Sequence, residues 1–143
     1  MTGDERTERP LTGPFWAAVN RHELVRPVCG ACGVSFFVPQ FACPRCQSTR
    51  WTFEPSSGRG RVHSHTTVYR PPTPEFVGPY VLADVDVEEG WHLLTWIVDC
   101  EPDEVYIDMA VAVRFVPGPD GRDLPAFAPA APESGMPAEG TAR

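Results

Sequence analysis

Two pairs of cysteines restrict the fold of this chain more than any other feature of its sequence. Cys29 and Cys32 form one C-x2-C pair, and Cys43 and Cys46 form a second pair ten residues further on. Two intervening residues let a tight turn aim both sulfurs at one point while backbone N–H groups donate to the thiolates. Gly33 follows the first pair and can adopt the positive φ that such a turn requires. The spacing therefore predicts a four-thiolate metal site.

The metal at this site is expected to be structural zinc. The apolar segment between the pairs, Val34 to Ala42, is too short to fold by burial alone. A structural zinc ion contributes about 10–16 kcal/mol of apparent free energy, comparable with the roughly 5–15 kcal/mol stability of a whole domain. An iron ion held by the same thiolates and a redox-active dithiol are the alternatives. Because four thiolates close the coordination sphere, no position is left for a substrate, and the zinc is not expected to be the catalyst.

The charges of the chain are unevenly distributed. The 143 residues carry a formal net charge of −7, and all 12 basic residues are arginines. Residues 21–70 contain seven arginines and two glutamates, whereas residues 71–143 contain three arginines and fourteen acidic residues. An anionic ligand is therefore expected near the first of these segments. The overall acidic excess argues against a general nucleic-acid-binding protein, because affinity for phosphate rests on lysine and arginine.

The length of the chain supports one compact domain with a small satellite. Residues 1–11 and 128–143 offer no apolar face to bury, so both are predicted to be disordered tails. Between them we expect a helical segment at 12–26, a zinc ribbon at 27–50 and a barrel at 51–127. No apolar stretch approaches the roughly 20 residues of a membrane span, and the charged N-terminus does not resemble a signal peptide. The chain is therefore expected to be cytoplasmic and without membrane contact.

The predicted helix has one apolar side. Thr12 is a plausible N-cap, and Pro14 suits the first turn of a helix. Phe15, Trp16 and Val19 follow at helical spacing and share one side. This side either packs on the core of the protein itself or contacts a partner chain, and we take these three residues as the candidate partner contact.

Beyond Trp51 the hydrophobic residues alternate with polar ones, which is the period of a β-strand. The alternation predicts five strands, at 59–70, 80–87, 91–98, 110–116 and 122–127. Five short strands with no second apolar layer favour a small closed barrel of the OB or a similar type. The fold class is therefore mostly β, with an N-terminal helix, a zinc ribbon and then a five-stranded barrel.

Two polar clusters on the predicted strands are weak candidates for a functional site. His63 and His65 share one strand face and can in principle bind a metal ion, but no carboxylate lies at matching spacing in that strand. Asp84, Asp86 and Glu88 alternate onto one face, with neighbouring carboxylates roughly 6.6 Å apart along the strand. Such rows are usually the solvated side of a sheet, so ordinary exposed histidines and acids are the favoured interpretation.

The fifth cysteine is not expected to be a nucleophile. Cys100 lies between Asp99 and Glu101, and adjacent carboxylates disfavour the thiolate, so it is interpreted as a packing residue or a surface thiol. The sequence has no G-x-S-x-G nucleophile elbow, no G-x-G-x-x-G after a strand and no P-loop. No catalytic residues are therefore predicted, and the chain on its own is not expected to be an enzyme.

Seven short motifs occur in an order and spacing that resemble the acyl-CoA-associated zinc-ribbon/OB-fold family. The motifs are Phe15-Trp16, C-x-x-C-G at 29–33, C-P-x-C at 43–46, S-G-x-G at 57–60, P-Y-V-x-A-x-V at 79–85, Glu89-Gly90 and M-x-V-x-V-x-F at 109–115. The resemblance covers residues 14–116. The chain departs from the family pattern at Asp108, where the family tends to have glycine, and at Gln40, where an arginine often follows the proline of the ribbon hairpin.

The resemblance implies an N-terminal helical segment, a rubredoxin-like zinc ribbon and an OB barrel. Members of the family usually work as non-catalytic partners of acyl-CoA enzymes, notably thiolase-fold enzymes and MaoC-type hydratases. In bacterial steroid side-chain breakdown, such a domain pairs with a thiolase-like aldolase that cleaves a β-hydroxyacyl-CoA. We therefore expect a hetero-oligomer in which this chain stabilises a thiolase-like aldolase or thiolase and helps to form its acyl-CoA channel. A MaoC-type enoyl-CoA hydratase is the alternative partner.

Four arginines of the basic segment are the candidates for contact with a CoA phosphate, because guanidinium groups bind phosphate through paired hydrogen bonds. They are Arg45, Arg50, Arg59 and Arg61. Simple solvated surface is the alternative interpretation of these residues. Two other function classes stay open. Zinc ribbons and OB barrels both occur in modules that bind single-stranded nucleic acid, although the acidic strands argue against one here, and a four-cysteine iron site would make the chain an electron carrier.

Overall fold

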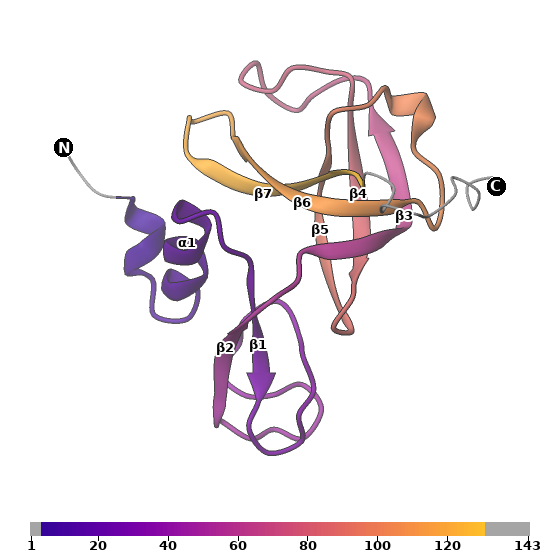
Figure 1. Ribbon diagram of the computed structural model, residues 1–143. Coiled ribbons are helices and arrows are strands. Elements are labelled where there is room, and N and C mark those ends of the chain that lie inside the picture. Colours follow the sequence, from indigo (N-terminus) through magenta and orange to yellow (C-terminus); the bar gives the residue numbers. More distant parts are fainter. Residues whose placement is uncertain (1–3, 131–143) are drawn as a thin grey trace.

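The computed structural model describes residues 4–130, which form a small helical unit, a two-stranded ribbon and a barrel (Figure 1). The helical unit and the ribbon contain η1 (Glu5–Glu8), α1 (Gly13–Asn20), β1 (Val25–Cys29) and β2 (Trp51–Pro55). The barrel contains β3 (Arg59–Val68), β4 (Tyr80–Val87), β5 (Trp91–Ile97), η2 (Pro102–Glu104), β6 (Ala110–Pro117) and β7 (Asp123–Pro129). In this part of the chain, no helix is long and apolar enough to cross a membrane.

The barrel is closed and has five strands, as the sequence predicts, and the structure gives their order as β3-β4-β5-β7-β6. All its pairs are antiparallel except the one between β5 and β7, which joins Ile97 and Phe127. In β4 every second residue points inward and is buried, beginning with Val81 and ending with Val87. The intervening positions, which include two aspartates, lie on the outer face. The alternation read from the sequence therefore places the core correctly.

The ribbon extends further along the chain than predicted. β2 pairs with β1 rather than with the barrel, in a register that sets Cys29 opposite Trp51 and Val25 opposite Pro55. The Trp51 ring also packs edge-on against Phe36 of the ribbon, with 5.7 Å between ring centroids. The predicted boundary at residue 51 therefore lies too early, because β2 pairs with β1 and its first residue, Trp51, packs on the small core of the ribbon.

The N-terminal segment contradicts the prediction of a disordered tail over residues 1–11. Residues 5–8 form η1, and Arg6 within it is only 9% exposed. Its guanidinium lies 4.0 Å from the centroid of the Trp16 ring and donates to the backbone oxygen of Asp123, while Asp4 balances its charge. Charged residues here satisfy one another, so no long apolar face is needed for order. Residues 1–3 lie outside the described residues.

The helix is shorter than the predicted segment 12–26. α1 ends at Asn20, the chain turns at His22 with φ of 60°, and β1 follows. Thr12 occupies the N-cap position, but its side chain makes no capping hydrogen bond. At the C-terminal end of the described chain, the last barrel strand, β7, continues to Pro129, beyond the predicted limit of residue 127. The rest of the predicted C-terminal tail, residues 131–143, lies outside the described residues.

One aromatic side chain joins the three parts of the molecule. Phe37 belongs to the hairpin between the two cysteine pairs. Its ring centroid lies 5.0 Å from that of Phe15 in α1 and 5.4 Å from that of Trp91 in β5. Trp91 is 1% exposed and Phe15 is 3% exposed, so both belong to the main core. The ribbon therefore contributes a side chain to the surface where the helix meets the barrel.

A carboxylate holds the linker that leads from the ribbon into the barrel. Glu89, in the turn between β4 and β5, accepts hydrogen bonds from the Ser56 hydroxyl at 2.7 Å, the Ser57 backbone N–H at 2.6 Å and the Trp91 indole at 3.1 Å. Burial opposes ionisation, but these donated hydrogen bonds outweigh it and lower the pKa of Glu89 to about 2. The linker is thus tied to the hairpin that carries Trp91.

Candidate metal centre and neighbouring surfaces

The structure brings the four predicted cysteines together at one end of the ribbon. The sulfurs of Cys29, Cys32, Cys43 and Cys46 all lie within 4.8 Å of one another. The Cys29 and Cys46 sulfurs are 3.6 Å apart, and those of Cys32 and Cys43 are 3.8 Å apart. Tetrahedral zinc with bonds of about 2.3 Å to sulfur requires sulfur separations of about 3.8 Å. The four thiols are therefore already spaced as zinc ligands.

Two equivalent turns aim these sulfurs. After the first pair, the Gly33 N–H donates to the Cys29 oxygen at 3.0 Å, and after the second, the Gln47 N–H donates to the Cys43 oxygen at 2.9 Å. Both residues have positive φ, 81° for Gly33 and 67° for Gln47. Of these two residues, only the glycine is predicted from the sequence to adopt positive φ. The signal for Gln47 was its position, since it follows the second pair as Gly33 follows the first.

Hydrogen bonds and crowding divide the charge unevenly among the thiols. The backbone N–H groups of Cys32 and Ala31 donate to the Cys29 sulfur, and chiefly the first of them lowers the pKa of Cys29 to about 6. At Cys46 the Ser48 N–H favours the thiolate, but hydrogen bonds to the neighbouring cysteine sulfurs, above all that of Cys29, together with burial favour the protonated thiol and raise the pKa to about 11. A divalent cation at the centre would replace these protons and stabilise all four thiolates.

The ribbon has only a very small apolar core of its own. Its buried members are Cys29, Cys43 and Phe36, against which Trp51 packs. Cys29 and Cys43 are 2% and 1% exposed, whereas the other two ligand cysteines face solvent. So few apolar contacts cannot hold a hairpin of this length, and metal ligation supplies the missing free energy.

The four candidate arginines lie in two separate places. Arg45 and Arg50 are exposed on the ribbon, and neither side chain forms an ion pair within residues 4–130. Arg59 and Arg61 lie at the start of β3, where Arg59 pairs with Glu88 at 3.0 Å and Arg61 donates to a backbone carbonyl before β6 at 2.9 Å. No hydrogen bond or ion pair joins the ribbon pair to the strand pair in the described structure.

The helix side proposed as a partner contact is already occupied by the protein itself. Phe15 and Val19 are 3% and 0% exposed and belong to the main core. Trp16 is half-buried and lies beneath the Arg6 guanidinium. Packing within the protein therefore leaves Phe15 and Val19 no surface for a partner, whereas contact of a partner with the exposed part of Trp16 stays a prediction.

The polar cluster on the strands differs from the one expected. An irregularity in the pairing of β3 with β4 falls at His63, whose ring nitrogen lies 3.3 Å from an Asp86 oxygen. His92 of β5 lies 2.8 Å from the other oxygen of Asp86, a cross-strand contact that strand periodicity alone cannot reveal. All three side chains are about half exposed. In the part of the chain that the structure describes, only the four cysteines are close enough together to hold a metal ion.

Cys100 behaves as predicted. It is partly buried and packs against the main core. Burial raises the pKa of its thiol, and the nearby carboxylates of Glu104, Asp99 and Glu101 raise it further. A thiol held in its neutral form is a poor nucleophile.

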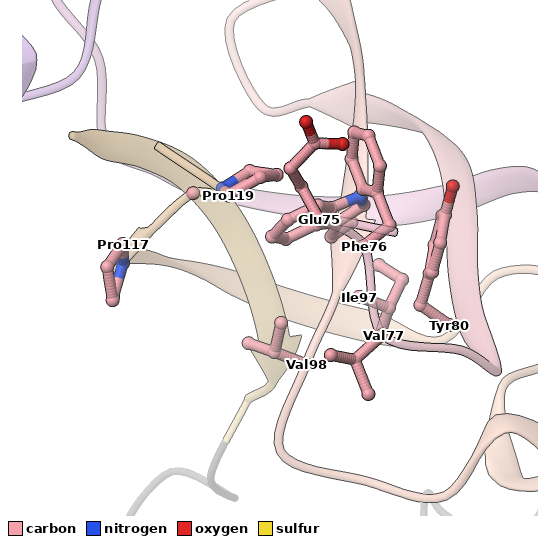
Figure 2. A pocket seen from close by; sticks show the side chains of 10 residues that line it. Glu75, Phe76, Val77, Tyr80, Ile97, Val98, Pro117 and Pro119 are labelled. Carbon is pink, nitrogen blue, oxygen red and sulfur yellow. The ribbon is translucent and has the colours of Figure 1, made fainter. Parts of the chain in front are cut away.

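An apolar pocket at one end of the barrel was not predicted. It is a cavity of about 240 Å³ between the loop that connects β3 to β4, the end of β5 and the turn between β6 and β7 (Figure 2). Its walls include the rings of Phe76, Tyr80 and Trp96, with Glu75 at the edge. These segments are far apart in the sequence, and only the closure of the barrel brings them together.

Family models match most of the described chain. A model described as the ChsH2 rubredoxin-like zinc ribbon domain matches residues 16–54. A model described as the ChsH2 C-terminal OB-fold domain matches residues 53–116. The point where these two matches meet agrees with the pairing of β2 in the ribbon.

Several relatives have sequences similar to this chain. A probable enoyl-CoA hydratase alpha subunit of Thermomonospora curvata is 36% identical over 83% of this chain, and the chain spans 38% of its length. A 3-oxo-4,17-pregnadiene-20-carboxyl-CoA hydratase alpha subunit of Mycobacterium tuberculosis is 34% identical over 76% of this chain, which spans 35% of its length. A DUF35 domain-containing scaffold protein of Methanothermobacter thermautotrophicus is 39% identical over 66% of this chain and 73% of its own.

Two solved structures share the fold. A chain of the structure titled Ltp2-ChsH2(DUF35) aldolase aligns over 86% of this chain and 100% of its own, with 33% identity and a TM-score of 0.77. A DUF35 protein from Sulfolobus solfataricus aligns over 82% of this chain and 83% of its own, with a TM-score of 0.55 at 14% identity, which supports the fold alone.

Proposed function

This chain belongs to the ChsH2 family of zinc-ribbon and OB-fold proteins, and we propose that it is a non-catalytic accessory subunit of a thiolase-like acyl-CoA enzyme. The observation that carries the proposal is the similarity to the whole length of a chain from an aldolase complex, at 33% identity. In this role the chain stabilises an aldolase or thiolase subunit and helps to form its acyl-CoA channel.

Two features of the site support a non-catalytic role. The metal centre has four thiolate ligands, so a bound zinc ion has no open position at which to activate a substrate. Relatives from three archaea that are 36–39% identical to this chain carry the name scaffold protein. A scaffold needs rigid surfaces, and the metal together with the closed barrel supplies them.

Contact with the CoA part of a substrate is best supported at the ribbon. Arg45 and Arg50 are exposed and carry no acidic partner among the described residues, so their guanidinium groups are available to phosphate. Arg59 and Arg61 are engaged within the barrel and must first give up Glu88 and a backbone oxygen. We therefore propose that the CoA phosphates bind nearer to Arg45 and Arg50. As a separate part of the proposal, the acyl groups are those of steroid side-chain degradation.

A MaoC-type enoyl-CoA hydratase is the second candidate partner. Two relatives are named as alpha subunits of hydratases, and one of those names specifies a pregnadiene-carboxyl-CoA substrate. The chain spans little more than a third of the length of either relative, so their activity resides in a protein with a further segment. A hydratase partner for this chain is therefore a separate proposal.

Co-expression with the thiolase-like subunit encoded in the same genome tests the proposal. We expect one complex by size-exclusion chromatography and light scattering, and aldolase or thiolase activity that needs both chains. A parallel co-expression with a MaoC-type hydratase distinguishes the second candidate. Failure to co-purify with the thiolase-like subunit under all conditions would reject the proposed function. Fluorescence anisotropy with labelled single-stranded oligonucleotides is expected to show no binding.

A further inference from the structure

The pocket at the barrel end has the size of a site for one large side chain. Its volume of about 240 Å³ is below the roughly 300–1,000 Å³ of pockets that enclose drug-sized ligands. In Figure 2 the loop residues Glu75, Phe76 and Val77 line one side of the cavity, and Pro117 and Pro119 line the other. A small group that enters between them is therefore in contact with both walls.

Aromatic rings dominate one wall of this pocket. The ring centroids of Phe76, Tyr80 and Trp96 lie 5.8–6.2 Å from one another. The planes of Phe76 and Trp96 are nearly perpendicular, at 83°. A group bound against this wall therefore meets more than one ring. Cations bind to aromatic faces within about 6 Å of the ring centroid, and the attraction grows as water is excluded.

The edge of the pocket carries a negative charge without a cationic partner in the described structure. The Glu75 side chain is exposed, and a hydrogen bond from the Thr73 hydroxyl lowers the pKa of its carboxyl. Residues 71–130 contain twelve acidic residues and only two arginines, and both arginines are engaged elsewhere. Arg114 pairs with Asp99, and Arg122 pairs with acids on its own turn and on the N-terminal segment. The pocket therefore favours a group that is apolar along its stem and positively charged at its end.

The surroundings of the pocket favour a protein ligand. Val77 is 84% exposed, and Pro117 and Pro119 are exposed as well. A small free ligand would leave this apolar edge in water, whereas a protein surface would cover it. Among cationic side chains, arginine stacks on aromatic rings, is weakly hydrated and is enriched among the residues that dominate binding energy.

We propose that this pocket receives an arginine side chain of the partner subunit, with its guanidinium against the aromatic wall and beside Glu75. The identity of the partner rests on the proposed function. The chemistry of the pocket does not, because it follows from the rings, the carboxylate and the size of the cavity.

The first experiment measures whether the pocket binds a guanidinium group, with small molecules as probes. The probes are N-acetyl-arginine methylamide and its neutral analogue, N-acetyl-citrulline methylamide, titrated into the zinc-loaded, ¹⁵N-labelled full chain. The Trp96 indole signal, assigned with Trp96→Phe, is expected to shift saturably with the arginine probe and at least fivefold more weakly with the citrulline probe. Equal binding of the two probes, or no binding of the arginine probe, would overturn the proposal.

The second experiment measures the dissociation constant of the complex between this chain and the thiolase-like subunit. With the thiolase-like subunit, Glu75→Gln is expected to raise the dissociation constant about tenfold. Asp103→Asn removes the same charge from an exposed position outside the pocket and is expected to leave the constant unchanged. Thermal melts of each variant verify folding.

The outcomes separate the two proposals. If the wild-type chain binds the thiolase-like subunit and Glu75→Gln binds equally well, the pocket inference is wrong and the proposed function stands. If the wild-type chain does not bind this subunit, the proposed function and the assigned partner fail together. The probe titration then still decides whether the pocket recognises a guanidinium group.

Discussion

Glu89 shows how one carboxylate can fix the position of a whole element. It accepts hydrogen bonds from the linker residues Ser56 and Ser57 and from Trp91 in the barrel. Hydrogen bonds to a charged group contribute about 1.5–3 kcal/mol each, and removal of the charge leaves donors without a full partner. Glu89 therefore helps to keep the ribbon beside the barrel, together with the ribbon side chains that pack on the main core, which are Val25, Phe37 and Phe53.

We predict that Glu89→Gln lowers the free energy of unfolding at pH 7 by about 1–2 kcal/mol, because a neutral amide is a weaker acceptor. Urea unfolding of the zinc-loaded protein measures this. Glu88→Gln is the matched control, since it removes a neighbouring charge from an exposed ion pair with Arg59, worth only about 0–1 kcal/mol.

The same residue predicts a pH dependence. Its folded pKa of about 2 lies below the usual 4.5, so its contribution is complete above about pH 4.5 and is lost as the pH falls towards 2. The stability difference between wild type and Glu89→Gln is therefore expected to be constant from pH 8 to 5 and to shrink below pH 4.5. A difference that grows in acid would contradict the assignment.

Residue identity alone predicts the metal ligands but not all of their support. The C-x2-C spacing predicts which sulfurs lie close together, because the geometry is local to each turn. Gln47 escapes prediction because glutamine has no special preference for positive φ, and its conformation follows from the second turn. Arg6 escapes because its partners, Trp16 and the Asp123 carbonyl, come from other elements.

At the scale of elements, β3 depends on one glycine. Gly60 pairs with Val87 of β4 and with Val111 of β6, so it lies where the barrel closes. A Cβ atom there would come within 2.5 Å of the Asp86 backbone oxygen and 2.8 Å of a Val85 methyl group. Glycine in such a strand marks a place where two backbones approach closely.

We predict that Gly60→Ala destabilises the barrel by at least about 2 kcal/mol, within the range of overpacking in a well-packed core. Gly90→Ala is the control: its Cβ would enter open space, and only the φ of 95° is strained, at a cost of about 1–3 kcal/mol. Chemical denaturation compares the two, and near-ultraviolet circular dichroism reports whether Trp91 remains packed. A smaller loss in Gly60→Ala than in Gly90→Ala would contradict this view of the barrel.

The ribbon hairpin supplies the second element-scale prediction. Truncation in Phe37→Ala leaves a cavity between Phe15 and Trp91, and removal of a buried phenyl group costs about 3–5 kcal/mol. Because Phe37 is only partly buried, we expect a loss near the lower end of that range. Phe41→Ala, at a ring that is 75% exposed on the same hairpin, is expected to change stability by less than about 0.5 kcal/mol.

The sequence predicts the positions of the barrel strands well, but it does not predict which elements pack against one another. The bounds of β4 agree with the prediction because valine and aspartate alternate through its whole length. The sequence predicts that residues 51–55 belong to the barrel, whereas β2 pairs with β1 of the ribbon. Alternation indicates that a strand exists but not which strand it pairs with. The sequence does not show that the protein itself covers the helix side with Phe15, because the residue that packs on it, Phe37, lies 22 positions away.

At the scale of the whole molecule, we expect the metal site and the barrel to unfold as one cooperative unit. The hairpin that contains Phe37 is bracketed by the two cysteine pairs, and it reaches the core between α1 and β5. We predict one zinc ion per chain by elemental analysis and no visible absorbance, which excludes thiolate-bound iron.

Removal of the zinc by a chelator is expected to lower the melting temperature of the barrel as well as to unfold the ribbon. Circular dichroism of the strands and the fluorescence of Trp91 follow this together. A barrel that melts at the same temperature with and without zinc would show that the ribbon is independent. Phe37→Ala should reduce the effect of zinc on the barrel, because it removes the contact that couples them.

The contact of Phe37 with the barrel has a consequence for the cell. If the chain is the accessory subunit proposed above, a core completed by a metal-folded hairpin makes its assembly depend on the supply of zinc. Scarcity of zinc, or oxidation of the exposed thiols Cys32 and Cys46, would then separate the subunit from its partner enzyme without any change in the active site of that enzyme. Under that proposal, flux through the acyl-CoA reaction would follow the zinc status of the cell, although zinc takes no part in the chemistry.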